Sequence, residues 1–189
     1  MTDARARGKI QVGYALKQFT EASIGATQGA WQQFMDENNM FDLEYMRAAN
    51  GARGQMDYSK TSDNEYAYGI FLDDSEVADA IVSILHQRRG GPDVGWLKML
   101  QLDLSPAFDE SLVATDLAKF RQVIRIYLAA IGGTINLQSV HRAKVTKLYG
   151  RTSHLLSVFT SVANELQQEL SGLAAVAMEG RWLVIRSAR

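Results

Sequence analysis

The chain has 189 residues, of which 47% are hydrophobic and 22% are charged, and its formal net charge is -1. This composition and length indicate a single compact, globular domain over residues 1–189. Because the chain contains no cysteine, disulfides, thiol catalysis and zinc sites built on thiolates are excluded. No apolar run reaches the roughly 20 residues that span a bilayer, and no apolar signal core follows the basic start. We therefore expect a cytoplasmic protein without a membrane partner.

The first third of the chain predicts helices. Residues 9–37 carry a stripe of small residues flanked by large apolar ones, which is typical of a helix that crosses a neighbour closely. A second helix over 40–49 is expected to end at Asn50-Gly51, because these residues adopt the left-handed conformation that ends helices. Residues 52–65 are polar and rich in turn formers, so they are predicted to form a loop.

The middle of the chain carries the best strand signal. Residues 66–72 read YAYGIFL, and their large side chains alternate with a period of two, which predicts a strand. The next segment, 73–87, is predicted to be a helix, because Asp73 can cap its start and Glu76 completes a capping box three residues later. Residues 95–104 fit both a helix and a strand, and we expect a short helix that runs into an extended segment.

Helices are expected to dominate the region after residue 104. Ser105-Pro106 is a typical helix start, and the one or two helices that follow are predicted to end at Gly132-Gly133. Short strands are expected near 66–72 and in a C-terminal hairpin near 173–186. The fold class that the sequence predicts is therefore mainly α with a small β component.

The C-terminal region, 139–186, has the element order of a winged helix-turn-helix. A basic helix over 139–149, a turn at Gly150, a helix over 153–171 and a hairpin follow one another in the order that such modules use. A recognition helix presents basic or amide side chains near its start, whereas this one would present serine and histidine. A winged-helix DNA-binding regulator is therefore an alternative and not the favoured interpretation.

Charge is sorted along the sequence. Residues 36–79 hold eleven acidic residues against three basic ones, whereas residues 117–164 hold no acidic residue. Within a helix over 139–149, spacings of three and four would place several cations on one face, where they would attract phosphates. The candidate nucleic-acid-binding residues are Lys119, Arg121, Arg125, His141, Arg142, Lys144, Lys147 and Arg151.

These patterns favour a non-enzymatic assembly protein, similar in kind to a nucleoprotein, that binds the backbone of DNA or RNA without strong sequence preference. Its basic face over 119–151 would contact phosphates. The acidic segment over 36–79 would meet the basic face of another copy in a homo-oligomer, or of a partner subunit in a larger complex. No cofactor is expected. A structural subunit that uses both charge patches on proteins, without nucleic acid, is an alternative.

One cluster of carboxylates suggests an alternative function, that of an enzyme. Asp73, Asp74 and Glu76 follow the strand over 66–72, and carboxylates at a strand end can hold Mg²⁺ for phosphoryl chemistry. A capping box explains Asp73 and Glu76 without a metal ion. An Mg-dependent enzyme at residues 73–76 is therefore the least favoured hypothesis, and no metal ligand or catalytic residue is assigned. No motif in the sequence identifies a family.

Overall fold

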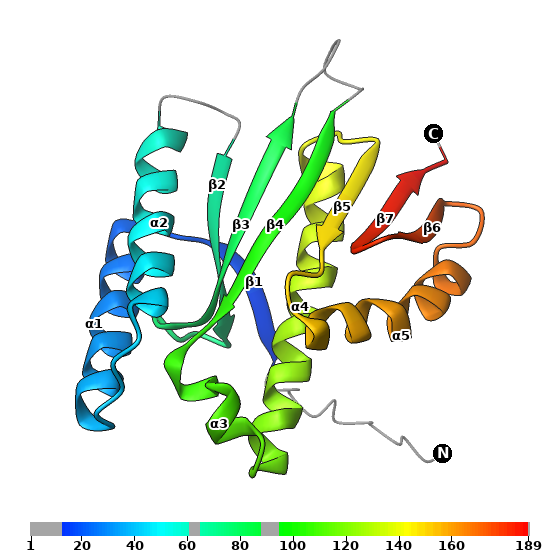
Figure 1. The fold of residues 1–189 in the computed structure, drawn as a ribbon. Helices are drawn as coiled ribbons and strands as arrows, with labels where there is room; N and C mark the ends of the chain where they lie inside the picture. The colour runs from blue at the N-terminus through cyan, green and yellow to red at the C-terminus, as the bar shows by residue number, and fades with distance from the viewer. Residues whose placement is uncertain (1–12, 61–64, 88–94, 189) are drawn as a thin grey trace, which may run out of the picture.

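The computed structural model describes residues 13–60, 65–87 and 95–188, and a seven-stranded sheet runs through this part of the chain in the order β1-β2-β3-β4-β5-β7-β6 (Figure 1). Neighbouring strands are antiparallel except for β4 and β5, which are parallel. The strands are β1 (Tyr14–Gln18), β2 (Glu65–Leu72), β3 (Ala78–Gln87), β4 (Trp96–Leu104), β5 (Val145–Tyr149), β6 (Ala174–Glu179) and β7 (Trp182–Ser187). The helices are α1 (Glu21–Glu37), α2 (Leu43–Ser59), a 3-10 turn (Pro106–Phe108), α3 (Glu110–Val113), α4 (Leu117–Val140) and α5 (Ser153–Glu169).

The predicted fold class, mainly α with a small β component, is wrong. The described residues form an α/β fold around a seven-stranded mixed sheet. The largest error is the helix expected over 73–87, where β3 lies instead. Helices cover both faces of this strand, so its apolar residues form a nearly continuous run. Ile81 and Ile84 then lie at helical spacing even though the backbone is extended.

The basic helix expected over 139–149 is also wrong. Helix α4 runs without a break to Val140, and β5 begins five residues later beside β4. Thr146 and Leu148 of β5 are buried by strand alternation, which has a period of two. Since no helix precedes α5 at the expected distance, the helix-turn-helix order expected over 139–171 is not formed.

Several other elements differ in extent. The segment predicted as a helix over 9–37 contains strand β1 before α1, and its first residues lie outside the described part of the chain. Helix α2 continues through Asn50-Gly51 into the expected loop over 52–65, of which residues 61–64 are not described. Residues 96–104 form a strand throughout. The expected strand near 66–72, the helix after residue 153 and the C-terminal hairpin are all present.

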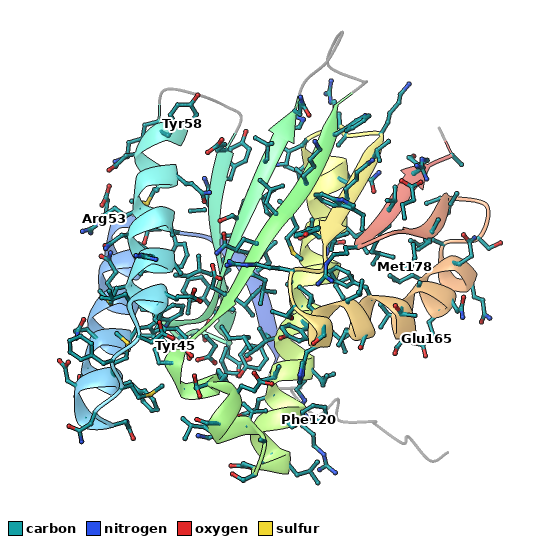
Figure 2. All side chains as sticks on the ribbon, viewed as in Figure 1. Tyr45, Arg53, Tyr58, Phe120, Glu165 and Met178 are labelled. Carbon is teal, nitrogen blue, oxygen red and sulfur yellow. The ribbon has the colours of Figure 1, made fainter. Side chains whose placement is uncertain are left out.

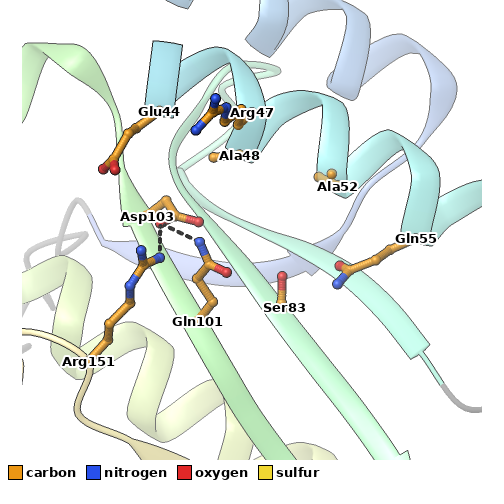
Figure 3. Close-up of a pocket in the computed structure, with 10 residues that line it drawn as sticks. Glu44, Arg47, Ala48, Ala52, Gln55, Ser83, Gln101, Asp103 and Arg151 are labelled. Carbon is orange, nitrogen blue, oxygen red and sulfur yellow. Dashed lines mark hydrogen bonds and ion pairs between the residues drawn. The ribbon is translucent and has the colours of Figure 1, made fainter. Parts of the chain in front are cut away.

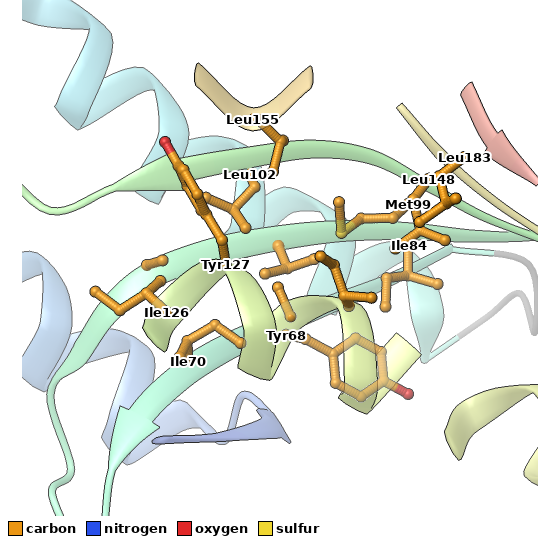
Figure 4. Close-up of a cluster of buried hydrophobic side chains, with 14 of the residues drawn as sticks. Tyr68, Ile70, Ile84, Met99, Leu102, Ile126, Tyr127, Leu148, Leu155 and Leu183 are labelled. Carbon is orange, nitrogen blue, oxygen red and sulfur yellow. The ribbon is translucent and has the colours of Figure 1, made fainter. Parts of the chain in front are cut away.

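The two faces of the sheet carry separate groups of buried side chains. On one face, α1 and α2 pack against β2 and β3, and Trp31 donates a hydrogen bond from Nε1 to the Ala78 carbonyl at 2.9 Å. On the other face, α4 contributes buried residues such as Ile126 and Tyr127 to a core shared with Ile84 and Met99 of the strands (Figure 4). The sheet is therefore held from both sides, which fixes the course of β3 and β4.

Within the described residues, α4 is long and apolar enough to cross a membrane by length and composition alone. Its buried residues belong to the core on the sheet. Core helices of soluble proteins have the same length and composition, so we do not infer a membrane span.

The glycines expected to end a helix at 132–133 lie inside α4, and they provide a matched pair for a stability test. A Cβ added at Gly133 would overlap Cβ of Leu16 in β1, whereas one added at Gly132 would meet nothing within 4 Å. We expect Gly133→Ala to lower the free energy of unfolding by about 1–3 kcal/mol through this overlap. Gly132→Ala should raise it by up to about 1 kcal/mol, because alanine favours helices. Urea denaturation of both variants tests the close approach, and equal effects would contradict it.

Candidate functional site

Strand β4 parts from β5 at a single inserted residue, Leu100. The parallel ladder between the two strands ends at Met99 and Leu148. At the same place the register between β4 and β3 shifts, because Ser83 pairs with Gln101 whereas Ile84 pairs with Met99. An extra residue of this kind bends a strand and increases its twist. The remainder of β4 therefore runs on without β5 beside it.

The inserted residue also reverses which side chains face the core. Before it, Leu97 and Met99 belong to the core beneath α4. After it, Leu102 takes that place, while Gln101 and Asp103 line a hollow beside α2. Since side chains alternate along a strand, the shift by one residue is what moves Asp103 out of the core.

A cavity of about 810 Å³ occupies the opening at the carboxyl ends of β4 and β5. Ligands of open α/β sheets commonly bind in this position. A smaller hollow of about 350 Å³ between α2 and the strands shares Glu44, Asp103 and Arg151 with it (Figure 3). Tyr45 and Phe120, which also line the cavity, lie at the same end of the molecule on α2 and α4 (Figure 2). The other apolar lining residues are Leu102, Leu104, Phe108, Val113, Ala114, Leu117, Val123 and Tyr127.

Asp103 lies between polar groups from three segments (Figure 3). Gln101 donates a hydrogen bond from Nε2 to Oδ1 of Asp103 at 2.9 Å, and Nη1 of Arg151 lies 3.7 Å from the same oxygen. Burial raises the pKa of Asp103 above its usual 3.8, and it outweighs the hydrogen bond and the guanidinium, which lower the pKa. The charge of Glu44 on α2 also raises it. A carboxyl group with a raised pKa is well suited to take up and release a proton.

The pKa of a second carboxyl group of the cavity, that of Asp109, is shifted in the opposite direction. Asp109 accepts a hydrogen bond from the Ser111 backbone N–H at 2.9 Å and one from the Tyr45 hydroxyl at 2.8 Å. Hydrogen bonding from Ser111 holds the pKa of Asp109 below its usual value, and burial raises the pKa of Tyr45. The pKa values of the two carboxyl groups are therefore shifted in opposite directions, as those of the acid and the base in acid–base sites often are.

The cavity has an excess of negative charge. Five carboxylates line it, against the side chains of Arg151 and His154. Both basic groups lie near acids of the same cavity, since Nε2 of His154 is 3.5 Å from Oε1 of Glu110 and Arg151 faces Asp103. A cationic group of a ligand would be attracted here. The five acids are Asp42, Glu44, Asp103, Asp109 and Glu110.

The eight basic residues selected from the sequence are not brought onto one helix face. Lys119, Arg121 and Arg125 lie on α4, and His141, Arg142 and Lys144 lie between its end and β5. Lys147 is on β5, where its Nζ is 3.9 Å from Oε2 of Glu179 and 4.6 Å from the centre of the Trp96 ring. Among the eight, only Arg151 lines the described cavity.

The proposed Mg²⁺ cluster is explained by a turn. Asp73 has a positive φ of 45° between β2 and β3, and its Oδ1 accepts a hydrogen bond from the Gly13 N–H at 2.8 Å. No helix follows, so the capping box with Glu76 is not formed. The described residues contain no group of three or more His, Asp or Glu side chains that could hold a metal ion.

Sequence reasoning missed Gln101 and Asp103. They alternate with Leu100, Leu102 and Leu104 in the segment LQLDL, just before Ser105-Pro106. The available signal was two polar residues, two positions apart, near the end of a strand. This signal can be read only if residues 96–104 are recognised as a strand throughout.

No protein-family model matches the chain, and no curated protein sequence matches it. Three similar solved structures are acetyltransferases. One from Agrobacterium tumefaciens has a TM-score of 0.44 at 12% identity and covers 93% of this chain and 91% of its own. A GNAT family acetyltransferase from Brucella melitensis, solved in complex with acetyl-CoA, has a TM-score of 0.42 at 7% identity, with coverages of 93% and 88%. One from Sphaerobacter thermophilus, described as putative, has a TM-score of 0.35 at 14% identity, with coverages of 93% and 94%.

The non-enzymatic, nucleic-acid-binding interpretation is therefore corrected. The basic helix on which the interpretation depended does not exist, and two of its cations, Lys147 and Arg151, lie against carboxylates of the same chain. The same correction applies to the two alternatives, a winged-helix regulator and an assembly subunit, and to the expected nucleic-acid partner.

The raised pKa of Asp103 predicts that its ionised form destabilises the folded protein at neutral pH. Because this pKa is higher in the folded protein than in the unfolded chain, the stability contributed by Asp103 is fully present below the ordinary value of 3.8 and is lost as the pH rises through the folded value. We expect Asp103→Asn to raise the free energy of unfolding at pH 7 by about 0.5–2 kcal/mol. Urea denaturation at pH 7 and at low pH, with the exposed Asp74→Asn as control, measures this difference. A loss of stability at pH 7 would contradict the argument.

Proposed function

We propose that the protein is an acyltransferase, which moves an acyl group from a thioester to an amine in the cavity between β4 and β5. The observation that carries the proposal is Asp103, a carboxyl group with a raised pKa at the polar end of a cavity of about 810 Å³. An intracellular location belongs to the same proposal.

The lining of the cavity suits an amine acceptor. At neutral pH most aliphatic amines are cations, and the five carboxylates of the cavity, Asp103 included, outnumber its two basic side chains. The rings of Tyr45, Phe108, Phe120 and Tyr127 also line the cavity, and aromatic faces attract organic cations. Charge and aromatic surface therefore favour an amphipathic amine.

The reaction needs a base, and Asp103 can supply it. The bound ammonium group gives a proton to the Asp103 carboxylate, and the free amine then attacks the thioester carbonyl carbon. A carbon–nitrogen bond forms as the carbon–sulfur bond breaks, and the departing thiolate takes up the second proton, which the attacking nitrogen loses. Asp103 then releases the first proton to solvent. The products are an amide and a thiol. Gln101 and Arg151 hold the carboxylate in place while this occurs.

The open part of β4 suits the donor. Residues 101–104 follow the last pair of the ladder with β5, so this edge faces the opening. A chain that contains amide groups can lie along such an edge and exchange hydrogen bonds with it, as an added strand would. This arrangement would direct the thioester toward the end of β4, where Asp103 lies.

Removal of the base provides the first test. We expect Asp103→Asn to lower kcat/KM for transfer from an acetyl thioester to a primary amine by about 10²–10⁴-fold, which is the usual contribution of a general base. Amide formation is measured with a panel of aliphatic diamines and monoamines. Asp74→Asn, in the exposed turn outside the cavity, should retain full activity. Unchanged kcat/KM in Asp103→Asn would reject the assignment of the base.

The pH profile provides the second test. A protonated carboxyl group cannot accept a proton, so kcat should fall as the pH is lowered through the pKa of Asp103 in the complex. Because burial raises this pKa, the fall should occur above the ordinary value of 3.8. The acid limb should be absent from the residual activity of Asp103→Asn. An acid limb that is identical in the variant would assign the titration to another group.

A further inference from the structure

We infer that the acyl donor of this site carries no nucleoside diphosphate and that its thiol carrier is an uncharged, amide-containing arm. The inference rests on the proposed function, because it names the donor for the same cavity. Three features of the described residues support it: the caps of the surrounding helices, the composition of the connection from β4 to α4, and the balance of charge.

Helix starts are the usual cradles for phosphate, since their N–H groups are unpaired and their dipoles favour negative charge. At the start of α4, where Thr115 and Leu117 line the cavity, these groups are already occupied by a carboxylate. Asp116 accepts hydrogen bonds at the start of α4 from the N–H groups of Ala118 at 2.8 Å and Lys119 at 3.1 Å. Asp109 occupies the start of α3 in the same way. A phosphate placed at either start would compete with a carboxylate for these donors.

The start of α5 at the same cavity is no better suited to a diphosphate. Thr152 accepts the hydrogen bond from the Leu155 N–H at 3.1 Å, so one of the first donors is used. Glu110 lies 3.5 Å from His154 in the first turn of this helix. Carboxylates therefore lie at the starts of α4 and α5, the two longer helices that begin beside the cavity.

The connection between β4 and α4 contains no glycine. Residues 105–131 all carry a side chain beyond the α-carbon, and the first glycine after β4 is Gly132. Phosphate-binding turns use glycine so that the backbone can approach the phosphate oxygens. Here the turn instead presents the acids Asp109 and Glu110 to the cavity.

An uncharged arm meets none of these obstacles. The edge of β4 over residues 101–104 offers hydrogen bonds to amide groups, and Leu102, Leu104 and Phe108 offer an apolar wall. Such an arm would bring the acyl group to Asp103 without placing negative charge beside the five carboxylates. The same carboxylates remain available to the cationic acceptor.

The test compares three acetyl donors with one primary amine: S-acetylpantetheine, S-acetyl-N-acetylcysteamine and acetyl-CoA. We expect kcat/KM for S-acetylpantetheine to exceed that for acetyl-CoA by about tenfold or more at low salt, and the ratio to shrink as salt screens the repulsion. A value for acetyl-CoA that equals or exceeds that for S-acetylpantetheine overturns the inference and leaves the proposed function intact. No transfer from any of the donors overturns the proposed function and, with it, the inference.

Variants with uncharged capping residues test whether the carboxylates at the helix starts cause the preference for the uncharged donor. Asparagine caps helices as well as aspartate does, so Asp109→Asn and Asp116→Asn remove charge and keep the turn. In each variant we expect the ratio of kcat/KM for S-acetylpantetheine to that for acetyl-CoA to fall by about fivefold. Asp74→Asn should leave the ratio unchanged. A ratio that stays constant in both cap variants, with circular dichroism showing that they are folded, overturns the electrostatic basis of the inference.

Discussion

The inserted residue Leu100 is the feature on which the rest of the site depends. One extra position in β4 ends the pairing with β5, bends the strand and reverses the alternation of its side chains. Leu102 then continues the core that Met99 began, while Asp103 enters the cavity. The opening in the sheet and the carboxyl group that serves it thus have a common cause.

The electrostatics of the cavity follow from this geometry. A carboxyl group on a central strand is surrounded by protein on several sides, so burial raises its pKa, whereas Asp109 in the following turn is held ionised by Ser111. The two environments lie within one cavity because the chain turns sharply at Ser105-Pro106 directly after β4. The carboxyl group that we propose as the base and the acids that would attract a cation therefore lie on neighbouring segments, each with its own local structure.

The sequence predicted elements whose signals are local. The strand near 66–72 and the C-terminal hairpin were recognised from alternation and from a glycine at the turn. Strand β3 was not recognised, because burial on both faces removes alternation and leaves an apolar run that also fits a helix. Asp103 was missed for a different reason: its orientation depends on how β4 pairs with its neighbours, and that pairing is tertiary. The sorting of charge along the chain also did not predict that Arg151, from the region without acids, lies beside Asp103.

The insertion in β4 also has an evolutionary consequence. Deletion of the single codon for Leu100 would restore the regular ladder, close the opening and turn a carboxyl group into the apolar layer beneath α4. Loss of the site by that route would also damage the fold, so a lineage could not drift gradually between an open and a closed sheet. Substitutions in the lining remain available to selection, and ligand preference can therefore diversify while the strand keeps its extra residue.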